Sequence, residues 1–91
     1  MCERCEPWLT TKPIPSRMVY DHIVERVRVA LTDGELELFE ASIPLDAIIP
    51  GATLPAYRKH LFACTMCSQL FILEVGGCHT VGDCWRPLHG N

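Results

Sequence analysis

Two pairs of cysteines have the spacing that metal-binding turns use, Cys2 with Cys5 and Cys64 with Cys67. Each pair can present two thiolates from one tight turn, and four thiolates at about 2.3 Å complete the tetrahedral coordination of a structural Zn²⁺ ion. We therefore predict one structural zinc site made by these four residues. A site closed by four sulfur ligands has no open position for a substrate, so it would stabilise a fold rather than catalyse a reaction.

The other cysteines leave two alternatives open. The competing ligand set is Cys64, Cys67, Cys78 and Cys84, with His79 as a further donor. The chemical alternative is a redox dithiol, because Cys-x-x-Cys spacing can lower the pKa of one thiol. We expect Cys64 and Cys67 between two strands, however, and not at a helix N-terminus that would stabilise a thiolate. Ser68 follows the second cysteine, where Gly would most easily give a left-handed turn.

The remaining chemistry-bearing residues show no catalytic pattern. The four histidines are scattered, at His22, His60, His79 and His89, and none of their spacings presents two imidazoles on one helix face. We find no Gly-rich phosphate loop and no nucleophile elbow. The sequence therefore predicts a protein that is not an enzyme and has no small-molecule substrate.

Length and composition predict one zinc-stapled domain over residues 1–91. A chain of 91 residues buries only roughly two-thirds of the surface that it exposes when unfolded, so its core is thin. Structural zinc contributes an apparent ~10–16 kcal/mol in small peptides, comparable with the whole stability of a domain. We expect a small α+β fold, mostly an antiparallel β-sheet, with a zinc-ribbon-like element of four cysteine ligands and at most one or two short helices.

In the first half of the chain, the prolines of residues 7–16 favour an extended connector. Ser16 can cap a short helix that runs to about Ile23, with Met18, Ile23 and Val24 facing inward. Because this segment is rich in valine, a continuous strand is the open alternative.

The strongest turn signal is Asp33-Gly34, which separates residues 26–31 from residues 35–40. We predict a β-hairpin here, since both segments alternate and Asp-Gly favours a two-residue turn. The predicted register pairs Leu31 with Leu36 and Val29 with Leu38.

The second half starts with a proline-rich loop over residues 43–56, with at most one helical turn around residues 45–48. We predict a strand at residues 60–63, the Cys64–Cys67 turn, a strand at residues 69–75, a Gly76-Gly77 turn and a final strand through Trp85.

Charge disfavours a nucleic-acid partner. The net charge is −3, and phosphate binding depends on clustered Lys and Arg. A nucleic-acid-binding or transcription-associated module is the second hypothesis, and it requires the fold to gather the basic residues on one face. These residues are Arg17, Arg26, Arg28, Arg58 and Lys59.

The first hypothesis is a protein-binding module. Acidic residues suit a basic partner, and aromatic residues are common interface anchors. The candidate acidic residues are Glu35, Glu37, Glu40 and Asp46, and the candidate anchors are Trp8, Tyr57 and Trp85. The alternative for both tryptophans is a place in the core. The chain opens without a basic and then apolar leader, and no apolar run is long enough to span a bilayer, so we expect a cytoplasmic protein without a membrane partner.

One stretch carries a family resemblance. Residues 62–73, followed by residues 82–87, resemble the ending of short bacterial zinc-binding proteins, some of which are similar to immunity proteins of Rhs-type polymorphic toxins. The resemblance covers about the last third of the chain. It implies a cytoplasmic inhibitor that protects its producer by binding a cognate toxin.

Overall fold

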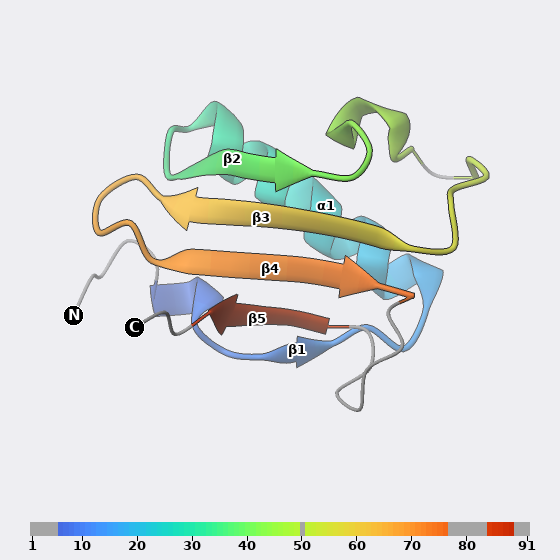
Figure 1. The fold of residues 1–91 in the computed structure, drawn as a ribbon, viewed down its shortest axis with the longest axis horizontal. Coiled ribbons are helices and arrows are strands. Elements are labelled where there is room, and N and C mark those ends of the chain that lie inside the picture. Colours follow the sequence, from blue (N-terminus) through green and yellow to red (C-terminus); the bar gives the residue numbers. More distant parts are fainter. Residues whose placement is uncertain (1–5, 50, 77–83, 89–91) are drawn as a thin grey trace.

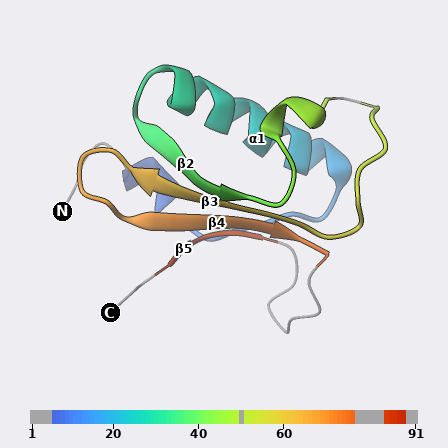
Figure 2. The same ribbon diagram turned by 45° about the horizontal axis from the view of Figure 1, so that its top comes forward.

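A computed structural model describes residues 6–49, 51–76 and 84–88 as two layers, a five-stranded antiparallel sheet and one helix packed on one of its faces (Figures 1 and 2). The strand order is β1-β5-β4-β3-β2. The elements in chain order are η1 (Glu6–Trp8), β1 (Lys12–Pro13), α1 (Arg17–Thr32), β2 (Leu36–Ala41), η2 (Leu45–Ala47), β3 (Arg58–Cys64), β4 (Leu70–Val75) and β5 (Cys84–Leu88). This confirms the expected small α+β fold with an antiparallel sheet.

Helix α1 replaces the first strand of the predicted hairpin, so that prediction was wrong. Residues 26–31 lie in the second half of a 16-residue helix, because the buried side chains recur at helical spacing. They are Tyr20, Ile23, Val24, Val27 and Ala30. Valine lowers helix propensity, but burial of this stripe against the sheet outweighs that small cost.

The start of α1 agrees with the prediction, but the length of the helix and the exposure of Met18 do not. Ser16 is the N-cap, as predicted, and its hydroxyl accepts a hydrogen bond from the Val19 amide at 3.3 Å. The helix runs well beyond Ile23. Met18, predicted to face inward, is 81% exposed, whereas Ile23 and Val24 are buried.

Asp33 and Gly34 end the helix instead of turning a hairpin. Gly34 has φ of 78° and donates its amide to the Leu31 carbonyl, and the Glu35 amide bonds to the Ala30 carbonyl. This pair of bonds is a Schellman motif, in which the residue after the C-cap adopts a left-handed conformation that glycine allows. After this dipeptide the chain continues into β2. Strand β2 pairs with β3 and not with residues 26–31.

The sheet confirms the predicted order of the second half. Strands β3, β4 and β5 form consecutive antiparallel pairs, and residues 45–47 form the single helical turn expected in the proline-rich loop. Gly76 ends β4 with φ of 84°, and a Cβ there would stand 1.9 Å from the Ala56 carbonyl oxygen. Only glycine permits this close backbone approach. Gly77 lies outside the described residues.

The core lies between α1 and one face of the sheet. From the sheet come Phe62 of β3, Phe71 and Leu73 of β4, and Trp85 of β5, all buried in one cluster with the helix side chains. Aromatic rings stack within it, with centroids 5.3 Å apart for Phe71 and Trp85. Among the described residues, no helix is both long enough and apolar enough to cross a membrane.

Candidate functional site

The Cys64–Cys67 turn joins β3 to β4, between two strands as predicted. The Met66 amide donates to Cys64 Sγ at 3.4 Å, and the Ser68 amide donates to the Cys64 carbonyl at 2.9 Å. Ser68 itself takes the left-handed conformation, with φ of 66°. Ser68 therefore adopts the left-handed conformation that glycine most easily takes.

The rest of the metal site is not described. Cys2, Cys5, Cys78 and His79 lie outside the described residues. Among the residues that are described, no group of three or more His, Cys, Asp or Glu side chains could hold a metal ion, so the zinc-ribbon element stays a prediction. Of the three cysteines within the described ranges, Cys64 and Cys84 are buried and Cys67 is exposed.

The sheet face that points away from α1, here called the outer face, carries ladders of matched side chains. Because successive strand residues alternate between faces and Phe62 points to the core, its neighbours Leu61 and Ala63 point outward. One ladder runs across the strands from Glu37 through Ala63 and Leu70 to Leu88. A second runs from Glu40 through Leu61 and Ile72 to Arg86.

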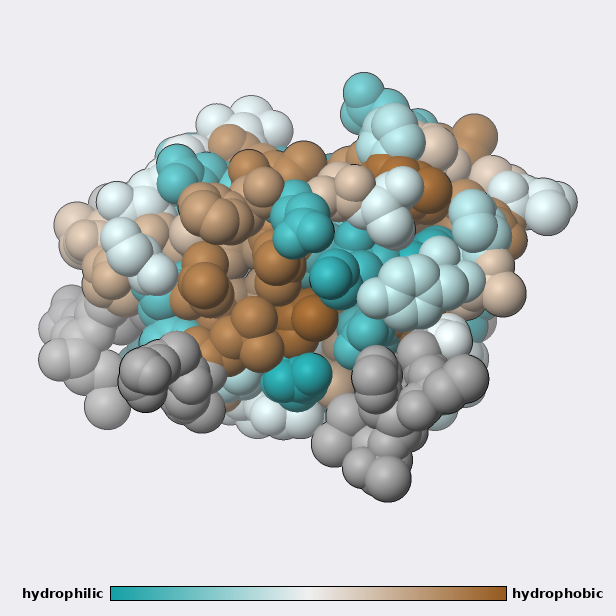
Figure 3. Space-filling model, viewed as in Figure 1, coloured by the Kyte–Doolittle hydropathy of each residue, from teal (hydrophilic) through white to brown (hydrophobic). Residues whose placement is uncertain are grey.

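These ladders make an apolar centre, with Glu37 and Glu40 at one end and Arg86 at the far end of the second ladder. Figure 3 views the outer face and shows apolar side chains gathered over part of the sheet, with hydrophilic residues beside them. Leu61, Leu70 and Leu88 are partly exposed, while Ala63 and Ile72 are buried. No helix of the described residues covers this face (Figure 2).

Strand β2 forms the acidic edge of the outer face. It pairs only with β3, so its other edge is open among the described strands, and a bulge lies between Leu38 and Glu40. The predicted partner-binding residues Glu37 and Glu40 are exposed on this strand. Phe39, which lies in the bulge, is 66% exposed. Phe39 was not predicted from the sequence, because the predicted hairpin paired this strand with residues 26–31, whereas the bulge belongs to its pairing with β3.

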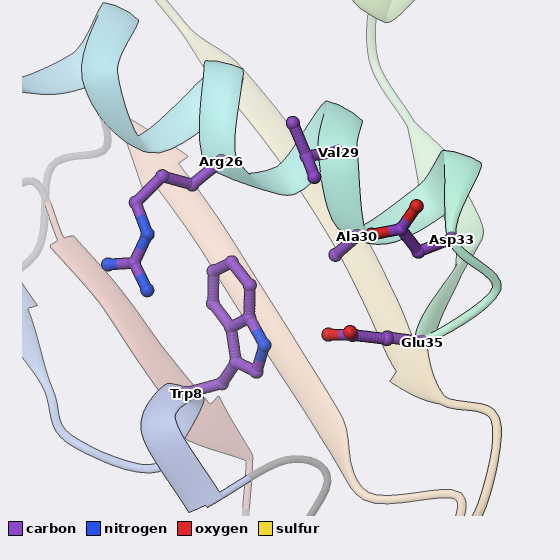
Figure 4. Close-up of a pocket in the computed structure, with 6 residues that line it drawn as sticks. All are labelled: Trp8, Arg26, Val29, Ala30, Asp33 and Glu35. Carbon is purple, nitrogen blue, oxygen red and sulfur yellow. The ribbon is translucent and has the colours of Figure 1, made fainter.

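Glu35 lies apart from this edge, in a cavity of about 260 Å³ between η1 and the C-terminal half of α1. Figure 4 shows its carboxylate directed toward the Trp8 indole, with Asp33 nearby and Arg26 on the other side of the ring. The Arg26 guanidinium carbon is 5.0 Å from the centroid of the Trp8 ring. An aromatic face beside two carboxylates is an arrangement that suits a cationic group.

Of the remaining predicted partner-binding residues, Asp46 and Tyr57 lie at the surface and Trp85 lies in the core. Asp46 is exposed in η2, and Tyr57 is exposed with its hydroxyl donating to Glu74 at 3.1 Å. Trp85 is 1% exposed, so the structure contradicts its use as a surface anchor. It lies in the core, as does Trp8, because both large rings pack on each other with centroids 5.1 Å apart.

Most of the basic residues bond to the chain itself. Arg17 donates to the Ala52 and Ile49 carbonyls and pairs with Asp21 at 2.8 Å. Arg28 donates to the Leu45 and Ile48 carbonyls. These side chains anchor the proline-rich loop to α1. They are therefore less available to phosphates than a solvated basic patch would be.

Comparison of the chain with models of protein families, with curated protein sequences and with solved structures gave no match.

Proposed function

We propose that this chain is a non-enzymatic protein-binding module of the immunity type, which neutralises a basic toxin domain in the cytoplasm by direct binding. A structural zinc ion at Cys2, Cys5, Cys64 and Cys67 would hold the fold together. The observation that carries the proposal is the outer face, where an apolar centre lies against the acidic edge of β2.

The outer face has the composition of a binding surface. Apolar contact supplies most of the free energy at an interface, and charged groups at its rim set orientation and association rate. Leu61 and Leu70 offer the apolar contact, and Glu37 and Glu40 lie at one rim. The broad side of the molecule measures 36 by 30 Å, which accommodates the roughly 800 Å² that a specific interface buries on each partner.

Charge and exposure indicate a basic partner. Glu37 is not in an ion pair among the described residues, and Glu40 has only a 4.0 Å pair with Lys59, both at the surface. Exposed pairs of this kind contribute little, typically about 0–1 kcal/mol, so these carboxylates can turn to a partner at small cost. Phe39 beside them is the exposed aromatic anchor that such an interface uses.

A nucleic-acid module is the second candidate function, and its basis is weaker. Arg17, Arg28 and Arg58 donate hydrogen bonds to backbone carbonyls of their own chain. Recruiting them to phosphates would cost those contacts.

The test is isolation of the tagged chain from its own cells at low ionic strength, followed by native mass spectrometry and calorimetry with the captured partner. The variant is Glu37→Lys with Glu40→Lys, and the matched control is Glu6→Lys with Glu25→Lys, which changes net charge equally at exposed positions of η1 and α1. We expect the first variant to weaken a stoichiometric, basic partner about tenfold or more, and the control to bind as the parent does.

Two results would contradict the proposal separately. Equal affinity of both double variants would exclude the acidic edge as the interface. A captured partner that is not toxic when expressed alone, or whose toxicity this chain does not relieve, would exclude the immunity-type function.

A further inference from the structure

One ladder of the outer face has opposite charges at its two ends. It begins with an exposed carboxylate on β2 and ends with a partly exposed guanidinium on β5, and in strand order it consists of Glu40, Leu61, Ile72 and Arg86. Arg86 is in no ion pair with any residue that the structure describes. The 4.0 Å pair of Glu40 with Lys59 is at the surface and contributes little. Both charges can therefore bind a partner across the face.

A face with this order of charges is complementary to a second copy of itself. Consider two copies packed face to face about a two-fold axis that is parallel to the strands and passes between β3 and β4. Strand β2 of each copy then lies over β5 of the other, because β2 and β5 are equally far from that axis. Glu40 of each copy faces Arg86 of the other, and Leu61 faces Ile72 between them. The favourable ion pair thus occurs twice in one closed dimer.

The other charged residues of the outer face fit the same arrangement. Lys59 pairs across the strands with Glu74, so the axis sets Lys59 of one copy opposite the buried Glu74 of the other. Glu37 at the rim faces Leu88, which is uncharged. Within the described part of the outer face, this arrangement opposes no two like charges.

The second way to align the two sheets is electrostatically unfavourable. With the two-fold axis across the strands, β2 of one copy lies over β2 of the other. The carboxylates of Glu37 and Glu40 from both copies then meet at one rim, and the Arg86 side chains come together at the opposite side. Like charges across an interface cost affinity. Charge therefore selects the axis parallel to the strands.

The spacing and size of the outer face also suit a dimer. Sheets that pack face to face lie about 10 Å apart, a distance that a glutamate and an arginine extended toward each other can span. The broad side of the molecule measures 36 by 30 Å, which exceeds the roughly 800 Å² that each partner buries in a specific interface. Leu61, Leu70 and Leu88 are partly exposed there, and a second copy would remove them from water.

We propose that two copies of this chain associate through their outer faces in a closed dimer, in which Glu40 of each copy pairs with Arg86 of the other. The inference does not depend on the toxin partner. It goes beyond the proposed function, because the same face carries the proposed partner site and the two occupants exclude each other. The free chain is a dimer with its acidic edge covered, and a basic partner must displace the second copy.

The experiment is sedimentation equilibrium of the purified full chain, without any partner, over a series of concentrations at fixed ionic strength. We expect the mass to rise from the 10.2 kDa of the monomer to twice that value and no further. Glu40→Arg and Arg86→Glu should each weaken dimerisation about tenfold or more, because each sets like charges against each other twice. The charge-exchanged variant, which carries both substitutions, should regain most of the lost affinity.

The charge-exchanged variant also serves as an internal control. Glu40→Arg places a positive charge beside Lys59 within one copy, and the charge-exchanged variant keeps that neighbour, so its recovery isolates the contact between copies. Glu25→Arg is the matched control on the exposed surface of α1, and it should dimerise as the parent does. Circular dichroism checks that each variant is folded.

Four results would overturn the proposal. They are a parent chain that stays monomeric, single charge reversals that dimerise as the parent does, a charge-exchanged variant without recovery, and assembly that grows beyond a dimer. Because the experiment contains no partner, these results leave the proposed function standing. Failure to capture a toxin would likewise leave the dimer standing.

Discussion

The indole Nε1–H of Trp85 donates a hydrogen bond to the carbonyl oxygen of Trp8 at 2.9 Å, across 77 positions of the chain. This bond ties η1 to β5 and places one tryptophan ring against the other in the core. A buried backbone carbonyl that loses its donor is costly, so the bond fixes where the segment before β1 lies.

Replacing Trp85 by Phe should therefore lower the free energy of unfolding by roughly 2–4 kcal/mol. The change leaves the Trp8 carbonyl unpaired and removes buried ring volume. Urea denaturation followed by far-UV circular dichroism measures it. The control is Trp8→Phe, which keeps the carbonyl acceptor and should cost less. Equal losses in the two variants would show that ring volume alone matters.

The buried imidazole of His60 should make stability depend on pH. The residue is 0% exposed, its Nε2 bonds to the Ile43 carbonyl at 2.8 Å, and Nδ1 has no partner among the described residues. Burial lowers the pKa of His60, and Arg58 lowers it further, against the opposing effect of the Ile43 bond. The folded chain thus binds this proton less readily than the unfolded chain.

Since the unfolded chain binds more protons in this window, stability rises with pH there. The contribution of His60 is fully present above the ordinary histidine pKa of about 6.5 and is lost as pH falls below it toward the lowered value. Urea denaturation at a series of pH values should show this slope, and His60→Phe should flatten it while being less stable at pH 8, because the Ile43 bond is lost. An unchanged slope in that variant would assign the pH dependence to other groups.

The zinc prediction separates into two ligand sets. Cys64→Ser and Cys67→Ser should each release the metal and sharply lower the melting temperature under either set, because structural zinc contributes an apparent ~10–16 kcal/mol in small peptides. Cys2→Ser should do the same if the N-terminal pair completes the site. Cys84→Ala should then keep the metal.

Elemental analysis of purified variants, together with thermal melting, measures both effects. Loss of zinc in Cys84→Ala with retention in Cys2→Ser would identify the second ligand set instead. A chain whose melting curve is the same in Cys64→Ser and in the parent would exclude structural zinc.

The second half of the fold was predictable because its signals are local. Residues 60–63 and 69–75 alternate around a short turn, and proline marks the loop before them. The second half of helix α1, after Ile23, was missed because valine suggests a strand and Asp33-Gly34 suggests a hairpin. Ser16 indicates where the helix starts, but its full length is indicated by the spacing of Tyr20, Ile23, Val24, Val27 and Ala30, a pattern that extends across both of the predicted segments.

Of the candidate binding surface, the exposure of Glu37 and Glu40 could be predicted from alternation along one strand. The residues beside them across the sheet could not be predicted in this way. Leu61 and Ile72 are aligned with Glu40 by the pairing of strands that are distant in the sequence.

Strand β1 pairs with β5, the last strand of the sheet, so one edge of the sheet joins segments from opposite ends of the described chain. During synthesis, α1, β2, β3 and β4 can assemble while β5 is still inside the ribosome. The ring of Trp85, its bond to Trp8 and the β1 pairing are added only when β5 joins. Until β5 joins the sheet, the chain therefore has an unfilled core and an open β4 edge, and in that state it is most exposed to pairing with other chains.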